Sequence, residues 1–295
     1  MANISVNTTL LNESINVNHN GSLHEDYENI EFILHVVTYI IAGIGLPLLL
    51  VAIYALYSQV KNGQVAPVYI INLFISDLIQ LCCLIIWESE PEEVMIQRVN
   101  YTYTFGVLTS VGFMVCISLE RYLVIAHPLW YRFRRTIRIS VGVCVVVWII
   151  SLVLSFTVVP WVTEFVANMV VSIFIIIPFP LFIFFLVGTL RALSTSVSVP
   201  SDEKRRIVAI LVLVLLIYTL LFLPYIILLT AGTYFYDFTL NVLSHLFVKL
   251  SPLADLLLYV FIKKETFRKL WTSVCCCRKE NNDTINTDTI NLDHM

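Results

Sequence analysis

Long apolar segments alternate with short polar ones along most of the chain. The apolar segments are seven in number and cover residues 31–57, 67–88, 99–126, 139–160, 166–192, 206–232 and 239–262. A helix of about 20 apolar residues crosses the hydrocarbon core of a bilayer, which is about 30 Å thick. The pattern therefore predicts an all-α membrane protein with a seven-transmembrane helix bundle over residues 31–262.

The composition supports a membrane environment. Hydrophobic residues make up 58% of the 295 residues and charged residues only 13%, which gives a mean hydropathy of +0.85. One soluble core cannot hide so much apolar surface, so we expect the bilayer to be the solvent.

Basic residues indicate how the bundle is oriented. They gather in the segments on one side of it, at Lys61, Arg132, Arg134, Arg135, Arg138, Lys204, Arg205, Arg206, Lys263, Lys264, Arg268 and Lys269. Because basic loops stay in the cytoplasm, we expect the N-terminus to be extracellular at the plasma membrane. The polar segment 1–30 would then be an extracellular tail, glycosylated at the sequons of Asn3, Asn7, Asn12 and Asn20, and the first span an uncleaved signal anchor.

The third apolar segment ends in a charged pair, Glu120 and Arg121, followed by Tyr122. A guanidinium at this depth is costly in lipid and needs a carboxylate, a water-filled cavity or a protein partner. The pair predicts either a switch or, as the simpler alternative, an ion pair where a helix leaves the membrane.

A set of short motifs falls in order along the seven segments, at Asn72–Leu78 with Asp77, Glu120–Tyr122, Trp148, Pro178, Phe222–Tyr225 and Asp255–Tyr259. With them, the chain resembles the rhodopsin-like G-protein-coupled receptors over residues 31–274. Gly45-Leu46-Pro47, the Phe-x-Pro-Tyr form at Phe222 and the aspartate at Asp255 resemble the branch with nucleotide, lysolipid and proton-sensing receptors.

The resemblance implies a coupling switch. Arg121 would be held by Glu120 at rest, and with Tyr122 and Tyr259 it would meet a heterotrimeric G protein once the sixth helix swings outward. Pro224 lacks a backbone donor and bends its helix, so the cytoplasmic half can act as a lever. Tyr218 and Phe222 would be its packing pivots, with ordinary interhelical packing as the alternative.

The resemblance also places two intramembrane carboxylates, Asp77 and Asp255, near one another and close to Ser110 and Ser251. Two desolvated carboxylates do not both stay ionised without compensation, so we expect the site to hold a proton, a sodium ion or both. The alternative is a satisfied polar network that locks the helices together.

Several family positions are altered. Leu49, Leu186 and Leu256 replace a polar residue of the first helix, a tyrosine of the fifth and the proline of the seventh. No cysteine lies at the outer face, and Ile96 occupies the position of the usual outer disulfide. These losses support an alternative in which the protein does not signal alone and partners another receptor, as a receptor dimer.

The resemblance extends beyond the seventh span. Residues 263–274 resemble the family's amphipathic eighth helix, since Phe267 and Trp271 share one face of this basic stretch. Cys275, Cys276 and Cys277 follow it and are predicted palmitoylation sites in contact with membrane lipid. Residues 275–295 would form a cytoplasmic tail.

An outer ligand pocket is predicted around Lys249, a lone ammonium in the outer half of the seventh span. Its candidate partner is Glu88, and Tyr103, Thr104, Tyr225 and His245, with Arg98, would complete the pocket. The pair is either structural or receives an anionic headgroup of a small-molecule, lipid-like or nucleotide ligand. Retinal, which binds at this position in light-sensing relatives, is the least favoured ligand.

Proton sensing is a further alternative, because His19, His24, His35 and His245 lie on or near the outer side. The sequence contains no catalytic triad, metal-ligand spacing or phosphate-binding glycine loop, so we expect neither an enzyme nor a metal site. We also expect no nucleic-acid binding. A transporter is less favoured than a receptor because the chain shows no internal repeat.

Overall fold

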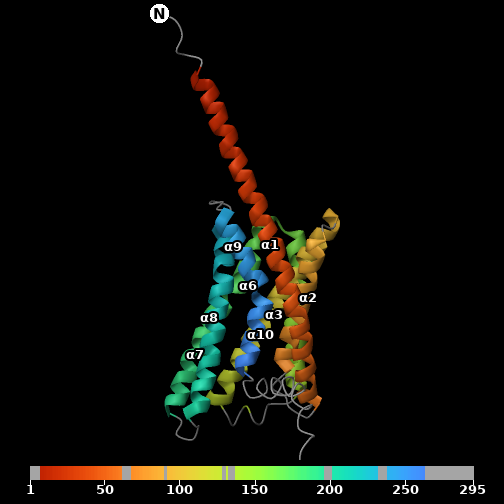
Figure 1. Ribbon diagram of the computed structural model, residues 1–295. Helices are drawn as coiled ribbons and strands as arrows, with labels where there is room; N and C mark the ends of the chain where they lie inside the picture. The colour runs from red at the N-terminus through yellow and green to blue at the C-terminus, as the bar shows by residue number, and fades with distance from the viewer. Residues whose placement is uncertain are drawn as a thin grey trace, which may run out of the picture.

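The computed structural model describes the backbone of residues 7–61, 68–89, 92–127, 131, 137–195, 201–231 and 238–262. The elements in these ranges are helical (Figure 1). The first three are α1 (Asn7–Lys61), α2 (Val68–Glu88) and α3 (Glu93–Ala126). Each one crosses the bundle as a single helix.

Of the later crossings, the fourth, fifth and seventh each contain more than one helical element. The fourth runs through α5 (Ile137–Leu152), a π-helical turn η1 (Val153–Val158) and a 3-10 turn η2 (Val159–Trp161). The fifth joins α6 (Glu164–Ile176) to α7 (Pro178–Thr195), and the sixth is α8 (Ser201–Ala231). The seventh is divided into α9 (Phe238–Lys249) and α10 (Ser251–Ile262). The fold is therefore the predicted all-α seven-helix bundle.

Six helical stretches of the described chain are long and apolar enough to cross a membrane, and they are Phe32–Ser58, Val68–Glu88, Glu93–Ala126, Ile137–Trp161, Phe165–Ser194 and Val208–Thr230. The seventh crossing falls short of this length because it breaks at Leu250. Pro252, the second residue of α10, has no backbone N–H, and its ring disfavours a continuous helix through the preceding turn.

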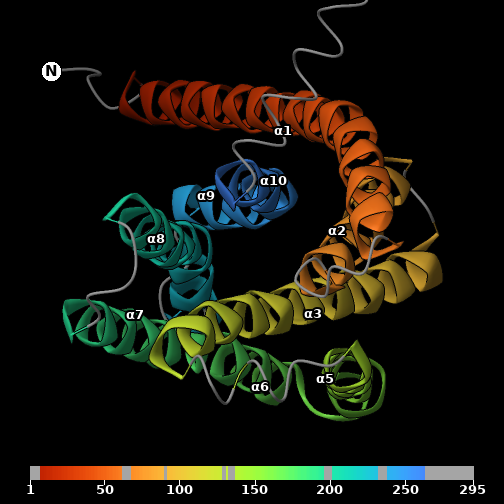
Figure 2. The same ribbon diagram turned by 90° about the horizontal axis from the view of Figure 1, so that it is seen from below.

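The helix α3 is the central element of the bundle. It packs against α2, α5, α6, α7 and α8 and runs obliquely across the view along the bundle (Figure 2). Gly106 allows its close approach to α2, because a Cβ there would lie 2.7 Å from Gln80 Cγ and 3.3 Å from the Ser76 carbonyl oxygen. Residues on α3 therefore reach most other helices.

The distribution of burial is the reverse of that in a soluble protein. Large apolar side chains such as Ile149 and Leu216 are 56% and 57% exposed on the outside of the bundle, whereas Asp77 and Asp255 are 0% and 1% exposed inside it. Aromatic and aliphatic side chains fill the rest of the interior. Lipid is the medium in which such an exterior is stable.

The N-terminal part of the structure differs from the prediction. The helix α1 begins at Asn7, inside the segment expected to be a tail, and projects beyond the other helices (Figure 1). Polar residues do not by themselves end a helix, and Pro47 is the first proline of the chain. The glycosylation side chains, the expected eighth helix, the tail and Cys275–Cys277 lie outside the described residues.

Candidate functional site

The C-terminal end of α3 holds a charged cluster. Arg121 Nη2 lies 3.8 Å from Glu120 Oε2, and the hydroxyl of Tyr131 donates to Glu120 Oε1 over 2.5 Å. Glu120 is 6% exposed, while Arg121 Nε is buried and has no hydrogen-bond partner among the described residues. Arg121 therefore keeps unused hydrogen-bonding capacity at the end of the bundle.

Tyr122 fixes the neighbouring contact between α3 and α7. Its ring stacks on Phe185 with centroids 5.7 Å apart and also packs against Phe184. Gly188 faces the ring, and a Cβ at this position would lie 2.6 Å from Tyr122 Cε2. The α7 helix approaches Tyr122 closely only because residue 188 has no side chain.

Tyr259, on α10, lies apart from the Glu120 contacts. Its ring packs edge-on against Phe74, with centroids 5.5 Å apart. Its hydroxyl is buried without a partner in the described structure. It has the capacity to form a hydrogen bond that this arrangement of helices does not make.

The middle of α8 carries an aromatic cluster. Tyr218 and Phe222 are fully buried, with ring centroids 4.7 Å apart, and Tyr218 also packs against Phe179 and Phe182 of α7. The Tyr218 hydroxyl donates to the Ile175 carbonyl over 2.6 Å, which ties α8 to α6. The predicted pivots thus lie at a junction of three helices.

Pro224 lies two residues after Phe222 in α8, towards the end of this helix at Ala231. The hydroxyl of Ser244 on α9 donates to the Pro224 carbonyl over 3.0 Å. This hydrogen bond joins the sixth crossing to the seventh beside the proline.

The two intramembrane carboxylates are buried on neighbouring helices, Asp77 on α2 and Asp255 on α10, which pack against one another. Ser110 donates to Asp255 Oδ2 over 3.1 Å. Gln80 donates to Asp77 Oδ1 over 3.3 Å and accepts from Ser251 over 3.2 Å. Asp77 Oδ2 and Asp255 Oδ1 are buried with no partner in the part of the chain described.

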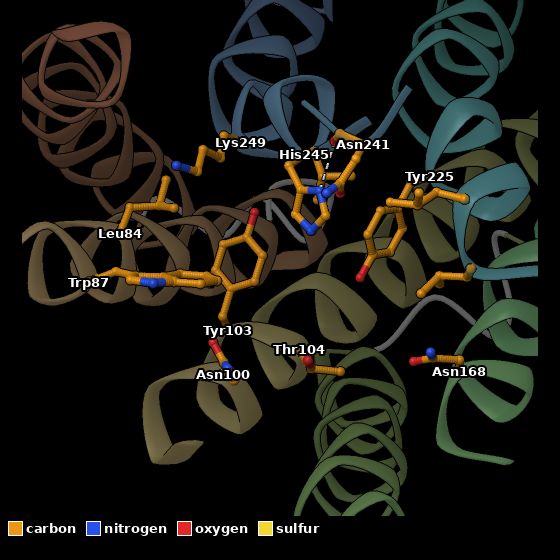
Figure 3. Close-up of a pocket in the computed structure, with 13 residues that line it drawn as sticks. Leu84, Trp87, Asn100, Tyr103, Thr104, Asn168, Tyr225, Asn241, His245 and Lys249 are labelled. Carbon is orange, nitrogen blue, oxygen red and sulfur yellow. Dashed lines mark hydrogen bonds between the residues drawn. The ribbon is translucent and has the colours of Figure 1, made fainter. Parts of the chain in front are cut away.

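The half of the bundle in which α3 begins contains a cavity of about 510 Å³ (Figure 3). It is lined by side chains from α2, α3, α6, α8 and α9, namely Leu84, Trp87, Asn100, Tyr103, Thr104, Asn168, Tyr225, Leu228, Leu229, Asn241, His245, Val248 and Lys249. Of the predicted pocket residues, Glu88 lies behind this lining and the other five line the cavity. Arg98 is exposed and outside the lining.

Lys249 belongs to a polar cluster that joins three helices. Its Nζ lies 3.7 Å from Glu88 Oε1 on α2 and donates to Thr38 Oγ1 on α1 over 3.1 Å. It also lies 6.0 Å from the centroid of the Trp87 ring. The second Glu88 oxygen pairs with His35 Nδ1 on α1.

Several residues of these sites were not predicted from the sequence. Gln80, Tyr131 and Thr38 are neutral residues whose importance comes from helix packing, which no local pattern reveals. Asn100, Asn168 and Asn241 line the cavity. They were not predicted either, because their place in it also depends on helix packing. A buried glutamine in an apolar segment was the one available signal, since Gln80 needs partners in lipid.

The match to known families agrees with this architecture. Residues 48–165 match the family model for the seven-transmembrane receptors of the rhodopsin family. Over these residues the chain is similar to the rhodopsin-like receptors. The expected resemblance is thus confirmed, and the members of this family are receptors rather than enzymes.

Individual rhodopsin-like receptors share moderate similarity with the chain. It is 30% identical over 161 residues to the human (Homo sapiens) G-protein coupled receptor 68, a match covering 50% of this chain and 41% of that receptor. The bovine (Bos taurus) form is 27% identical over 157 residues, which is 50% of this chain and 42% of the relative. The human type-1 angiotensin II receptor is 27% identical over 126 residues, or 40% and 34% of the two chains. The chain therefore matches about two fifths of the length of the human and bovine G-protein coupled receptor 68.

Proposed function

We propose that the protein is a plasma-membrane receptor that converts ligand binding in the outer cavity into activation of a heterotrimeric G protein. The observation that carries the proposal is Arg121 near the C-terminal end of α3, whose side chain is 21% exposed and whose buried Nε is unpartnered in the described structure. Its carboxylate neighbour Glu120 is shared with Tyr131. An outward movement of α8 would expose Arg121, with Tyr122 and Tyr259, to a partner protein.

The cavity is connected to this end through α8. Tyr225 lines the cavity directly after Pro224, whose carbonyl accepts a hydrogen bond from Ser244 on α9. A ligand that shifts Tyr225 or His245 therefore acts on the bend of α8, and Tyr218 and Phe222 form the pivot below it. Rigid-body motion of helices about such a bend is a common switching device.

The buried carboxylates are the proposed site of a sodium ion or a proton. The residues fit a small hard cation, because Asp77, Asp255, Ser110 and Ser251 supply oxygen atoms and two carboxylate oxygens lack partners among the described residues. Such a cation would hold α2, α3 and α10 together and resist the activating movement. Replacing sodium with choline in the assay below should then raise the basal output, and an unchanged output would exclude the sodium role.

The test of coupling compares Arg121→Ala with Arg98→Ala, which removes an exposed arginine of the same helix. Cells would carry each variant, and G-protein dissociation, cyclic AMP and calcium would be measured with lysolipid and nucleotide panels and across about pH 6 to 8, where histidine titrates. We expect a response that Arg121→Ala abolishes and Arg98→Ala preserves. A response that survives Arg121→Ala would contradict the proposed coupling site.

A second candidate is a receptor-like protein that pairs with another receptor and does not signal alone. Leu186 and Leu256 support it, because neither supplies the polar or bending element usual in the family. Silence of a surface-delivered chain in every panel, with output restored only on co-expression of a second receptor, would favour this function.

We also propose that the N-terminus is extracellular and the basic ends of the helices cytoplasmic. The excess of lysine and arginine on one side supports this orientation. It would place the cavity on the side from which an extracellular ligand arrives, and Arg121 on the side of the G protein.

A further inference from the structure

The charge of the outer cavity is already neutralised within the protein. Lys249 is the cationic side chain among the residues that line it, apart from the titratable His245. Its ammonium donates to Thr38 and lies 3.7 Å from Glu88. In Figure 3 this ammonium points away from Tyr225 and Thr104, so it is directed to the wall and not to the centre of the cavity.

Loss of the ion pair with Lys249 would be unfavourable for Glu88. Its side chain is 6% exposed, and its two oxygens face Lys249 and His35. An anionic ligand that bound the Lys249 ammonium would compete with Glu88 for it and weaken the ion pair of this buried carboxylate. Breaking one side of a buried ion pair is strongly unfavourable, because the remaining charge is desolvated.

The lining of the cavity includes neutral hydrogen-bonding groups. The Tyr103 hydroxyl and the Asn100 amide oxygen are buried without a partner in the described chain. The first can donate and the second can only accept. His245 Nδ1 lies 2.9 Å from the Asn241 carbonyl oxygen and must donate to it, which leaves Nε2 of the neutral ring as an acceptor.

The remaining lining is apolar and includes Leu84, Trp87, Leu228, Leu229 and Val248. Tyr103 packs edge-on against Trp87 with ring centroids 6.4 Å apart. A mostly apolar cavity with a few unpaired polar groups suits an amphipathic molecule whose polar end meets those groups.

From this arrangement we propose that the cavity binds an uncharged amphipathic ligand whose head carries both a hydrogen-bond donor and an acceptor, as a fatty acid amide does. The head carbonyl accepts from Tyr103, and the amide N–H donates to Asn100. The fatty acid with the same chain should bind more weakly, because its carboxylate has no free cation to meet and cannot donate to Asn100. The inference deepens the proposed receptor function by naming its ligand class, although binding itself does not depend on coupling.

The test uses oleamide and oleate, which share one acyl chain and differ in the head. The purified full-length chain in nanodiscs would be titrated with each, and the thermal midpoint would be followed. We expect oleamide to raise the midpoint and oleate to bind at least about tenfold more weakly, since a site with paired polar groups discriminates strongly against a mismatched head. Equal or tighter binding of oleate, or no binding of either probe, would overturn the proposal.

Two variants identify the groups responsible. Glu88→Gln releases Lys249 and should improve oleate binding by about tenfold, whereas Glu92→Gln, at an exposed carboxylate, should leave both affinities unchanged. Tyr103→Phe removes only the donor and should weaken oleamide but not oleate. Unchanged oleamide affinity in Tyr103→Phe would contradict the assignment, even if Glu88→Gln failed to fold.

The outcome is separable from that of the receptor proposal. Arg121→Ala lies far from the cavity lining and should bind oleamide as the unaltered chain does. Intact oleamide binding in a chain that never activates a G protein would refute the coupling function and leave the ligand class standing. The absence of oleamide binding in a chain with Arg121-dependent output would refute the ligand class and leave the coupling function standing.

Discussion

Gly188 has room for a hydrogen atom but not for a methyl group. A Cβ there would lie 2.6, 3.3 and 3.4 Å from three atoms of the Tyr122 ring, which is itself stacked on Phe185. We expect Gly188→Ala to destabilise the protein by about 1–3 kcal/mol, the usual cost of overpacking. The thermal midpoint in detergent should fall by several degrees.

Gly142→Ala is the matched control. A Cβ at Gly142 meets nothing within 4 Å, and alanine is favoured over glycine in a helix by about 0.5–1 kcal/mol. The midpoint of this variant should stay constant or rise slightly. A fall of the same size in both variants would mean that glycine is needed for a reason other than the Tyr122 contact.

Some residues of the sites could be predicted from the sequence and others could not. Lys249 and the aspartates were predicted because a charge in an apolar segment is conspicuous. Gln80 joins Asp77 to Ser251, and Tyr131 joins a segment after α3 to Glu120. Gln80 is marked in the sequence only as a polar residue in an apolar segment, and Tyr131 is not unusual in its local sequence. Which neutral residue completes a site depends on how helices face one another.

At the scale of whole helices, Ser244 on α9 joins this helix to α8 at Pro224. The hydrogen bond crosses from one helix to the carbonyl of Pro224 on the other. We expect Ser244→Ala to lower the stability by about 0.6 kcal/mol, the average for interhelical hydrogen bonds in membranes, and by no more than about 1.7 kcal/mol, the largest such value. Unfolding by heat or detergent titration would measure this loss.

Ser194→Ala provides the comparison, because the Ser194 hydroxyl is exposed and bonds only within its own helix, to the Arg191 carbonyl. Its stability should change little. If Ser244→Ala were equally neutral, the tie to Pro224 would carry no stabilising free energy and could not transmit a movement of α9 to α8.

The helices themselves were predictable, although their ends were less so. Spans could be read from apolar length because lipid requires it, and the described crossings follow the predicted segments. The start of α1 at Asn7 was not foreseen, since hydropathy marks where lipid begins and not where a helix begins. The breaks at Ile177 and Leu250 follow from Pro178 and Pro252, which the sequence shows directly.

For the molecule as a whole, the proposed orientation can be tested by glycosylation. With the N-terminus outside, the four sequons at Asn3, Asn7, Asn12 and Asn20 reach the glycosylation machinery. Treating the protein from cells with an N-glycosidase should increase its electrophoretic mobility, and replacing all four asparagines with glutamine should abolish that shift.

The tail supplies the control, because Asn282 also begins a sequon but lies on the opposite side in the proposed orientation. Asn282→Gln should leave the mobility unchanged. A shift that depended on Asn282 and not on the four N-terminal asparagines would reverse the assigned topology and with it the sides of the ligand and the G protein.

The division of the last crossing also bears on how the chain enters the membrane during synthesis. Each half, α9 and α10, has 12 residues, which is about 18 Å of helix against about 30 Å of hydrocarbon. Neither half can leave the translocation channel for lipid as an independent span, and Lys249 and Asp255 add to the cost of doing so. We therefore expect the final step of biogenesis to depend on helices inserted earlier, because Glu88 on α2 pairs with Lys249 and Ser110 on α3 donates to Asp255.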